Sequence, residues 1–191
     1  MTENASAVFF DRDGTLIADV PYNGDPAKVR LRRGAAECLK KLKKAGFLLF
    51  LISNQSGVGR GMITKADVDA VNKEMLRRLG GDFFKDIYIC YDAPGKDGGR
   101  RKPSPAMLEE AARDHGVDLK RSFMAGDKFC DVECAKRAGC KSILILGGGD
   151  DEDDEENVAA RHRADFVSED LDRAAEWIIK IRSQEPEFRI Q

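Results

Sequence analysis

The chain has 191 residues, the size of one domain, and 42% of them are hydrophobic, which is enough to build a core without disulfides or metals. Its 32 Lys and Arg residues nearly balance its 34 Asp and Glu residues, for a formal net charge of −2. This balance argues against a protein that coats nucleic acid or anionic membranes, and the apolar content argues against general disorder.

Apolar runs and helically spaced apolar residues alternate along the chain. Strands are predicted, in chain order, over 7–10, 47–52, 86–91, 122–125 and 142–146. Helices are predicted over 34–46, 64–79, 104–115, 130–138 and 170–181, with Ser104 as an N-cap and Pro105 as the first helical residue of the third. This alternation predicts an α/β fold, a three-layer sandwich with a parallel Rossmann-like sheet.

These elements use nearly the whole chain, so we expect a single domain, 1–191, without a large cap. The loops 19–25 and 92–100, the second of them Gly-rich, or a partner chain would then have to cover the site. The acidic stretch 150–156 is predicted to be a solvated loop, with metal binding as the alternative.

The longest apolar run, 47–52, is too short to cross a bilayer, and the first residues carry no secretory signal. Five cysteines are an odd number in a chain that does not need disulfides, which indicates reduced thiols. We therefore expect a cytoplasmic protein.

Polar residues follow four of the predicted strands. They are Asp11 with Asp13, then Ser53, then Lys102, and then Asp127 with Asp131. Because ligands of open α/β sheets bind beyond the carboxyl ends of the strands, these four loops should converge on one site.

The residue types at this edge suit phosphoryl transfer. The neighbouring carboxylates of Asp11 and Asp13 repel each other, and Mg²⁺ would relieve that repulsion. Oxygen ligands without His or Cys nearby favour Mg²⁺ over Zn²⁺. A carboxylate can attack phosphorus, while Ser53 could donate to a phosphoryl oxygen and Lys102 could neutralise developing charge.

The run 9–16, Phe-Phe-Asp-Arg-Asp-Gly-Thr-Leu, resembles the first motif of the haloacid dehalogenase (HAD) superfamily of phosphohydrolases. Ser53 matches its second motif, Lys102 its third, and Gly126-Asp127 with Asp131 its fourth, so the resemblance covers nearly the whole chain. More narrowly, 11–16, 53–61 and 101–103 resemble the branch that contains heptose 1,7-bisphosphate phosphatases and histidinol-phosphatases.

The resemblance implies an Mg²⁺-dependent phosphomonoester hydrolase that works through an aspartyl-phosphate on a small phosphorylated metabolite. It implies that Asp11 is the nucleophile, that Asp13 is the general acid and base, and that Ser53 and Lys102 hold the phosphoryl group. Mg²⁺ would be held by Asp11, the Asp13 carbonyl, Asp127 and Asp131. The implied substrate contacts are Asp19, Tyr22, Asn54, Gln55, Ser56, Arg101 and Lys128.

Many members of the branch carry a structural zinc held by three Cys and one His before the third motif. This chain keeps Cys90 in that loop and has no histidine there, and a lone thiolate cannot build a closed tetrahedral site. We therefore expect no zinc.

The resemblance implies D-glycero-D-manno-heptose 1,7-bisphosphate as the expected substrate, and histidinol phosphate as the alternative within the branch. A polynucleotide 3′-phosphatase is a second hypothesis, which the balanced charge disfavours. A non-catalytic phosphate-binding regulator is the third, and it would need a missing catalytic group. We expect no nucleic acid or membrane partner, and a monomer or small homo-oligomer.

Overall fold

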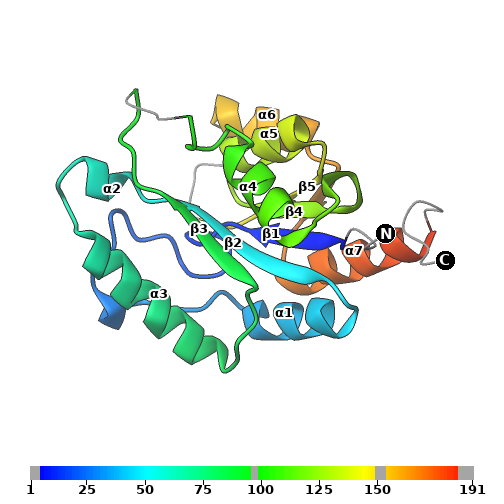
Figure 1. Cartoon of the computed structure of the whole chain (residues 1–191), viewed down its shortest axis with the longest axis horizontal. Helices are drawn as coiled ribbons and strands as arrows, with labels where there is room; N and C mark the ends of the chain where they lie inside the picture. The colour runs from blue at the N-terminus through cyan, green and yellow to red at the C-terminus, as the bar shows by residue number, and fades with distance from the viewer. Residues whose placement is uncertain (1–4, 96–98, 149–153, 185–191) are drawn as a thin grey trace.

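The computed structural model describes residues 5–95, 99–148 and 154–184 of the chain (Figure 1). The strands are β1 (Ala7–Phe10), β2 (Leu48–Asn54), β3 (Asp86–Cys90), β4 (Phe123–Gly126), β5 (Lys141–Ile145) and β6 (Phe166–Ser168). The α-helices are α1 (Ala35–Lys44), α2 (Ser56–Gly59), α3 (Lys65–Leu79), α4 (Ala106–His115), α5 (Phe129–Ala138), α6 (Glu155–Arg163) and α7 (Leu171–Gln184).

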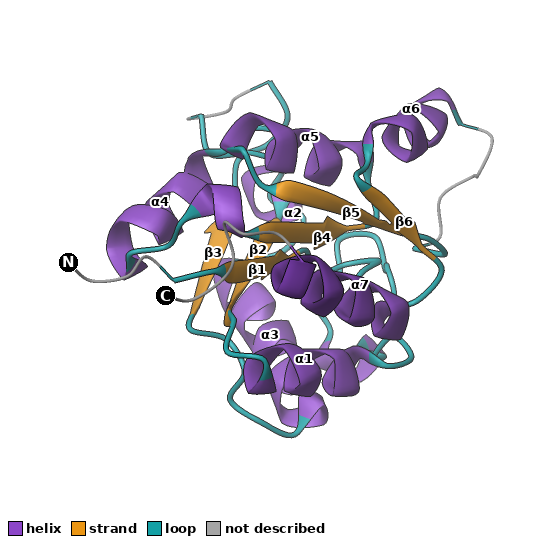
Figure 2. Cartoon of the chain, turned by 90° about the vertical axis from the view of Figure 1, so that its right-hand side faces the viewer, coloured by secondary structure: helices purple, strands orange, loops and turns teal. Residues whose placement is uncertain are grey.

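The strands form one parallel sheet in the order β3-β2-β1-β4-β5-β6. Helices α1, α3 and α7 cover one face, and α4, α5 and α6 cover the other (Figure 2). The α/β sandwich with a parallel Rossmann-like sheet is therefore confirmed. The strand order reverses at β1, which pairs with both β2 and β4, and ligands of such sheets bind beside this point.

Strand β1 shows why a continuous apolar run forms here. Val8 and Phe10 belong to the core under α1, α3 and α7, whereas Ala7 and Phe9 belong to the core under α4 and α5. All four side chains are fully buried, as expected of a central parallel strand covered on both faces. The strand that carries the first motif is thus held rigidly between two cores.

Two details of the predicted elements are wrong. Helix α4 begins at Ala106 with Pro105 at the N-cap, so Ser104 lies one residue too early for that position. Its hydroxyl donates to the Gly99 carbonyl and accepts a long hydrogen bond, 3.4 Å, from the Ala106 backbone N–H. The acidic stretch was predicted to be a loop, but Glu155 and Glu156 form the first turn of α6. Acidic side chains favour a helix N-terminus because of the helix dipole. The preceding residues, 150–153, lie outside the described part of the chain.

The described ranges contain no helix with both the length and the apolar character needed to cross a membrane. All five cysteines are free thiols.

Candidate active site

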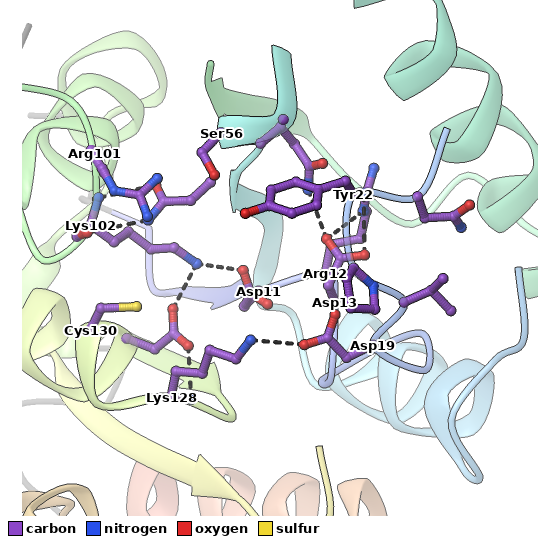
Figure 3. Close-up of a pocket in the computed structure, with 17 residues that line it drawn as sticks. Asp11, Arg12, Asp13, Asp19, Tyr22, Ser56, Arg101, Lys102, Lys128 and Cys130 are labelled. Atoms are coloured by element: carbon purple, nitrogen blue, oxygen red, sulfur yellow. Dashed lines mark hydrogen bonds and ion pairs between the residues drawn. The ribbon is translucent and has the colours of Figure 1, made fainter. Parts of the chain in front are cut away.

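A cavity of about 410 Å³ opens at the carboxyl ends of β1, β2 and β4, where the strand order reverses (Figure 3). Residues that follow all four motif strands line it. Those predicted from the sequence are Asp11, Asp13, Asp19, Tyr22, Asn54, Gln55, Ser56, Arg101, Lys102, Lys128 and Asp131. The sheet therefore brings together residues that lie more than a hundred positions apart.

Three carboxylates form the base of this site. Asp11, Asp127 and Asp131 each offer one oxygen, these oxygens lie within 4.8 Å of one another, and all three residues are buried. Asp11 directly follows β1, and its backbone N–H donates to the Ala125 carbonyl of β4 at 2.9 Å. Asp131 lies in the first turn of α5, where its Oδ2 accepts from the Lys128 backbone N–H at 3.1 Å.

Lys102 supplies the positive charge among these carboxylates. Its Nζ donates to Asp11, lies 2.6 Å from Asp131 Oδ1 and donates to the Ile52 carbonyl at 3.0 Å. The Lys102 side chain is only 2% exposed. Asn54 holds the backbone at this point, because its Oδ1 accepts from Lys102 N–H at 3.1 Å and its Nδ2 donates to the Lys102 carbonyl at 3.2 Å. Asn54, predicted as a substrate contact, thus also positions Lys102.

Burial and mutual repulsion perturb these groups. Burial raises the pKa of Asp11 to about 7, although Lys102 opposes the rise. Burial raises the pKa of Asp127 to about 8, and the negative charges of Asp11 and Asp131 add to that rise. Burial lowers the pKa of Lys102, but Asp11 and Asp131 outweigh it and raise that pKa well above its ordinary value. Lys102 contacts only two of the three clustered carboxylates, so a further cation would offset the remaining negative charge.

The donor set fits Mg²⁺. Asp127 Oδ1 accepts from the Thr15 hydroxyl at 3.2 Å, whereas its Oδ2 is buried and has no hydrogen-bond partner among the described residues. Carboxylate oxygens without imidazole or thiolate are the ligands of a hard divalent cation. The carboxylate of Asp13, another predicted ligand, lies outside this cluster, so the Asp13 main-chain carbonyl remains a prediction.

Gly14 shapes the wall behind Asp127. Its φ is +80°, and a Cβ added there would lie 1.9 Å from Asp127 Oδ2. The backbone of the first motif can approach this carboxylate only because residue 14 has no side chain.

We therefore expect Gly14→Ala to displace Asp127 and raise the Mg²⁺ concentration for half-maximal activity about tenfold or more, as expected when a metal ligand loses its support. An Mg²⁺ titration of the steady-state rate measures this. Gly80→Ala is the matched control, because Gly80 also has a positive φ, +75°, but nothing lies within 4 Å of its added Cβ. Equal effects of the two substitutions would mean that backbone strain alone, not contact with Asp127, is responsible.

The Asp13 carboxylate is held by two neighbours. Arg12 Nε donates to Asp13 Oδ2 at 3.0 Å and Arg12 Nη2 donates to Oδ1 at 3.1 Å. Gln55 Nε2 donates to the same Oδ2 at 2.7 Å and to the Ser53 hydroxyl at 2.8 Å. Gln55, predicted to touch the substrate, therefore links the first motif to the second.

The outer part of the cavity carries charged and aromatic groups. Lys128 Nζ donates to Asp19 Oδ2 at 2.8 Å, which ties the loop after β1 to the loop after β4 (Figure 3). Tyr22 stands at the rim, 43% exposed and with a φ of +49°, an uncommon conformation for a residue other than glycine. Arg101 Nη1 is buried, with no hydrogen-bond partner in the described ranges, so it is available to an anionic ligand.

Six residues that line the cavity were not among the predicted site residues: Arg12, Val20, Pro21, Asn23, Gly57 and Cys130. In the sequence, only its place between Asp11 and Asp13 could have indicated that Arg12 belongs to the site. Cys130 lies beside Lys102, and burial raises the pKa of its thiol, so it stays protonated. The proposed lid 92–100 falls partly outside the described residues, since 96–98 are not described.

Known proteins resemble this chain over most of its length. The family model described as HAD-hydrolase-like matches residues 99–174. A D-glycero-D-manno-heptose-1,7-bisphosphate 7-phosphatase of Thermosynechococcus vestitus is 37% identical over 185 residues, which cover 90% of this chain and 94% of that protein. One from Chlorobaculum tepidum is 40% identical over 75% of this chain and 79% of its own length.

A solved structure agrees with these relatives. The D,D-heptose 1,7-bisphosphate phosphatase of B. bronchiseptica, solved with magnesium and phosphate, superposes with a TM-score of 0.80 at 28% identity. The match covers 92% of this chain and 99% of that one.

Proposed function

Because the chain belongs to the HAD-like phosphatases, in the family of the D-glycero-D-manno-heptose-1,7-bisphosphate 7-phosphatases, we propose that it removes the 7-phosphate of that heptose bisphosphate. The observation that carries the proposal is the buried cluster of Asp11, Asp127 and Asp131. Lys102 pairs with Asp11 and Asp131 of this cluster, and these three residues line the cavity, whereas Asp127 lies behind them. The products would be inorganic phosphate and the heptose 1-phosphate.

Mg²⁺ would be held by Asp11 and Asp127, with Asp131 and the Asp13 carbonyl in support. When bound, the ion would neutralise charge on the phosphoryl oxygens and on the carboxylates, as divalent cations do in phosphoryl transfer. The buried, unpartnered Oδ2 of Asp127 supports this assignment.

Asp11 is the proposed nucleophile of the first step. Its free carboxylate oxygen attacks phosphorus while the bond from phosphorus to the sugar oxygen breaks, and Asp13 donates a proton to that oxygen. Lys102 keeps the Asp11 carboxylate oriented and, with the Ser53 hydroxyl, offers positive charge and a hydrogen-bond donor to the transferring group.

Asp13 then acts as the base of the second step. It takes a proton from a water molecule, the water oxygen attacks phosphorus, and the bond from phosphorus to Asp11 breaks. This releases phosphate and restores the Asp11 carboxylate. One side chain thus serves as acid and then as base, as a two-step hydrolysis requires.

The residues that line the cavity are suited to bind a small substrate with a phosphate at each end. Arg101 and Lys128 both line it and would contact the second phosphate, and Asp19 and Tyr22 would contact the sugar. All strands of the described residues form one sheet, and six α-helices cover its two faces, so short loops rather than a cap domain would cover the substrate. We propose that the chain acts as a single domain.

Steady-state kcat/KM over a panel of substrates tests this function. The panel holds both anomers of heptose 1,7-bisphosphate, histidinol phosphate and a 3′-phosphorylated oligonucleotide, each at saturating Mg²⁺. We expect the heptose bisphosphate to exceed the others at least tenfold, which corresponds to about 1.4 kcal/mol of transition-state discrimination. A preference for histidinol phosphate or for the oligonucleotide would replace the proposed substrate.

A further inference from the structure

Arg12 is the largest fully buried side chain of the described residues, and it lies between the two catalytic aspartates of the first motif. A buried guanidinium is costly unless its donors are paired. Two of them are used on Asp13, because Nε and Nη2 donate to the two carboxylate oxygens as a bidentate fork. The orientation of this fork, together with the hydrogen bond from Gln55, therefore sets the plane of the Asp13 carboxylate.

Asn72 fixes the other end of the fork. Its Oδ1 accepts from Arg12 Nη1 at 2.8 Å, in a buried contact between residues 60 positions apart. Asn72 lies on α3 among Val68, Val71 and Met75, which belong to the buried apolar side of that helix. A buried amide in such a place destabilises a fold unless it is hydrogen-bonded, and its partner here is the residue that holds Asp13.

We propose that Asn72 is a positioning residue, which orients the Arg12 guanidinium and through it the carboxylate of Asp13. The proposal rests on the acid and base role given to Asp13 above. Asn72 does not line the active-site cavity, and it is not part of the carboxylate cluster formed by Asp11, Asp127 and Asp131. It lines a second cavity, of about 550 Å³, beside α3 and β3. The support for Asp13 therefore comes from a helix outside the four motifs.

This arrangement predicts a defect in turnover rather than in binding. Without the Asn72 acceptor, the guanidinium can rotate about the Arg12 side chain, and the Asp13 carboxylate is then held in place only by the single hydrogen bond from Gln55. Proton transfer depends steeply on such geometry, whereas substrate binding and metal binding do not involve Asn72. We expect Asn72→Ala to lower kcat about tenfold or more and to change KM and the half-saturating Mg²⁺ concentration less than threefold.

Two variants bracket this effect. Asn72→Asp keeps an accepting oxygen at the same position, so we expect its kcat to stay within threefold of the parent chain. Lys73→Ala is the matched control, because Lys73 is the next residue on α3 and lines the same second cavity but is exposed. Its kcat should be unchanged. A kcat loss in Asn72→Asp as large as that in Asn72→Ala would overturn the role of the acceptor.

Kinetics with an aryl phosphate as substrate, p-nitrophenyl phosphate, distinguish the proton that Asp13 gives to the leaving group from the proton that it takes from water. The p-nitrophenolate group leaves without a proton, so the initial burst of p-nitrophenol, which reports attack by Asp11, should be slowed less than threefold in Asn72→Ala. The steady-state rate that follows, which needs Asp13 as the base, should fall as it does with the sugar phosphate. Equal slowing of burst and steady state would mean that Asn72 acts on the whole site rather than on Asp13.

Two further variants keep the test decisive. Asp13→Asn tests the premise that Asp13 is the acid and base, and full activity of this variant would refute that premise. If Asp13→Asn is inactive but Asn72→Ala has normal kcat, only the inference about Asn72 is overturned. If Asn72→Ala does not fold, Arg12→Lys replaces it, since lysine keeps the buried charge but lacks the fork. Its kcat should fall with KM nearly unchanged, and an unchanged kcat would overturn the proposal.

Discussion

Replacing Asp11 with Asn should abolish turnover, with a fall in kcat of about four orders of magnitude or more, the scale seen when a covalent nucleophile is removed. The amide has nearly the shape of the carboxylate but cannot form the aspartyl-phosphate. Steady-state phosphate release measures the loss, and mass spectrometry of the quenched enzyme should show a phosphorylated parent chain and an unmodified variant.

The fold should survive this substitution. Asp11 pairs with Lys102, but burial outweighs that attraction and raises the Asp11 pKa. A neutral amide therefore removes a disfavoured charge, and Lys102 keeps its ion pair with Asp131. We expect the melting temperature to change by less than about 4 °C, the equivalent of about 1 kcal/mol. Asp86→Asn is the control, because Asp86 begins β3 at the opposite end of the sheet, and it should leave kcat unchanged. Normal turnover by Asp11→Asn would place the nucleophile elsewhere.

The positions of the motif residues could be predicted because residues that follow the strands of a parallel sheet all lie at the same edge of that sheet. Asp11, Ser53 and Asp127 each lie at or just beyond the end of an apolar run, and carboxyl ends of parallel strands share one edge. The burial of the runs on both faces makes them easy to recognise. The sandwich and the convergence of the four motifs followed from this pattern.

Contacts made by side chains could not be predicted in the same way. Asn72 is an ordinary polar residue on a helix in the sequence, and only the packing of α3 against the sheet turns it toward Arg12. Gln55 was assigned to the substrate because of its motif, but the structure shows that its amide binds Asp13 and Ser53. Strand β6 was missed because it has only three residues, and a run that short carries no periodic signal.

The balance of charge in the site makes Lys102 the second residue whose loss should have a large effect. Lys102→Met keeps most of the length of the side chain but removes the ammonium that contacts both Asp11 and Asp131. Removing one partner of a buried ion pair costs about 3–5 kcal/mol, because the remaining charge is left uncompensated. We expect a loss of unfolding free energy of this size without metal, and a fall in kcat of about 10²–10³-fold, typical when one electrostatic stabiliser of a transition state is lost.

Mg²⁺ provides the decisive comparison for Lys102→Met. A cation bound by Asp11, Asp127 and Asp131 would offset part of the missing charge, and any ligand of the folded state stabilises it by mass action. Urea unfolding should therefore show a larger gain from Mg²⁺ over EDTA in Lys102→Met than in the parent chain. Lys128→Met is the control for stability, because Lys128 pairs with Asp19 at the partly exposed rim, where such pairs contribute less than about 1 kcal/mol. If Lys102→Met is no less stable than Lys128→Met in EDTA, the carboxylates of the site do not depend on the Lys102 ammonium for their charge balance.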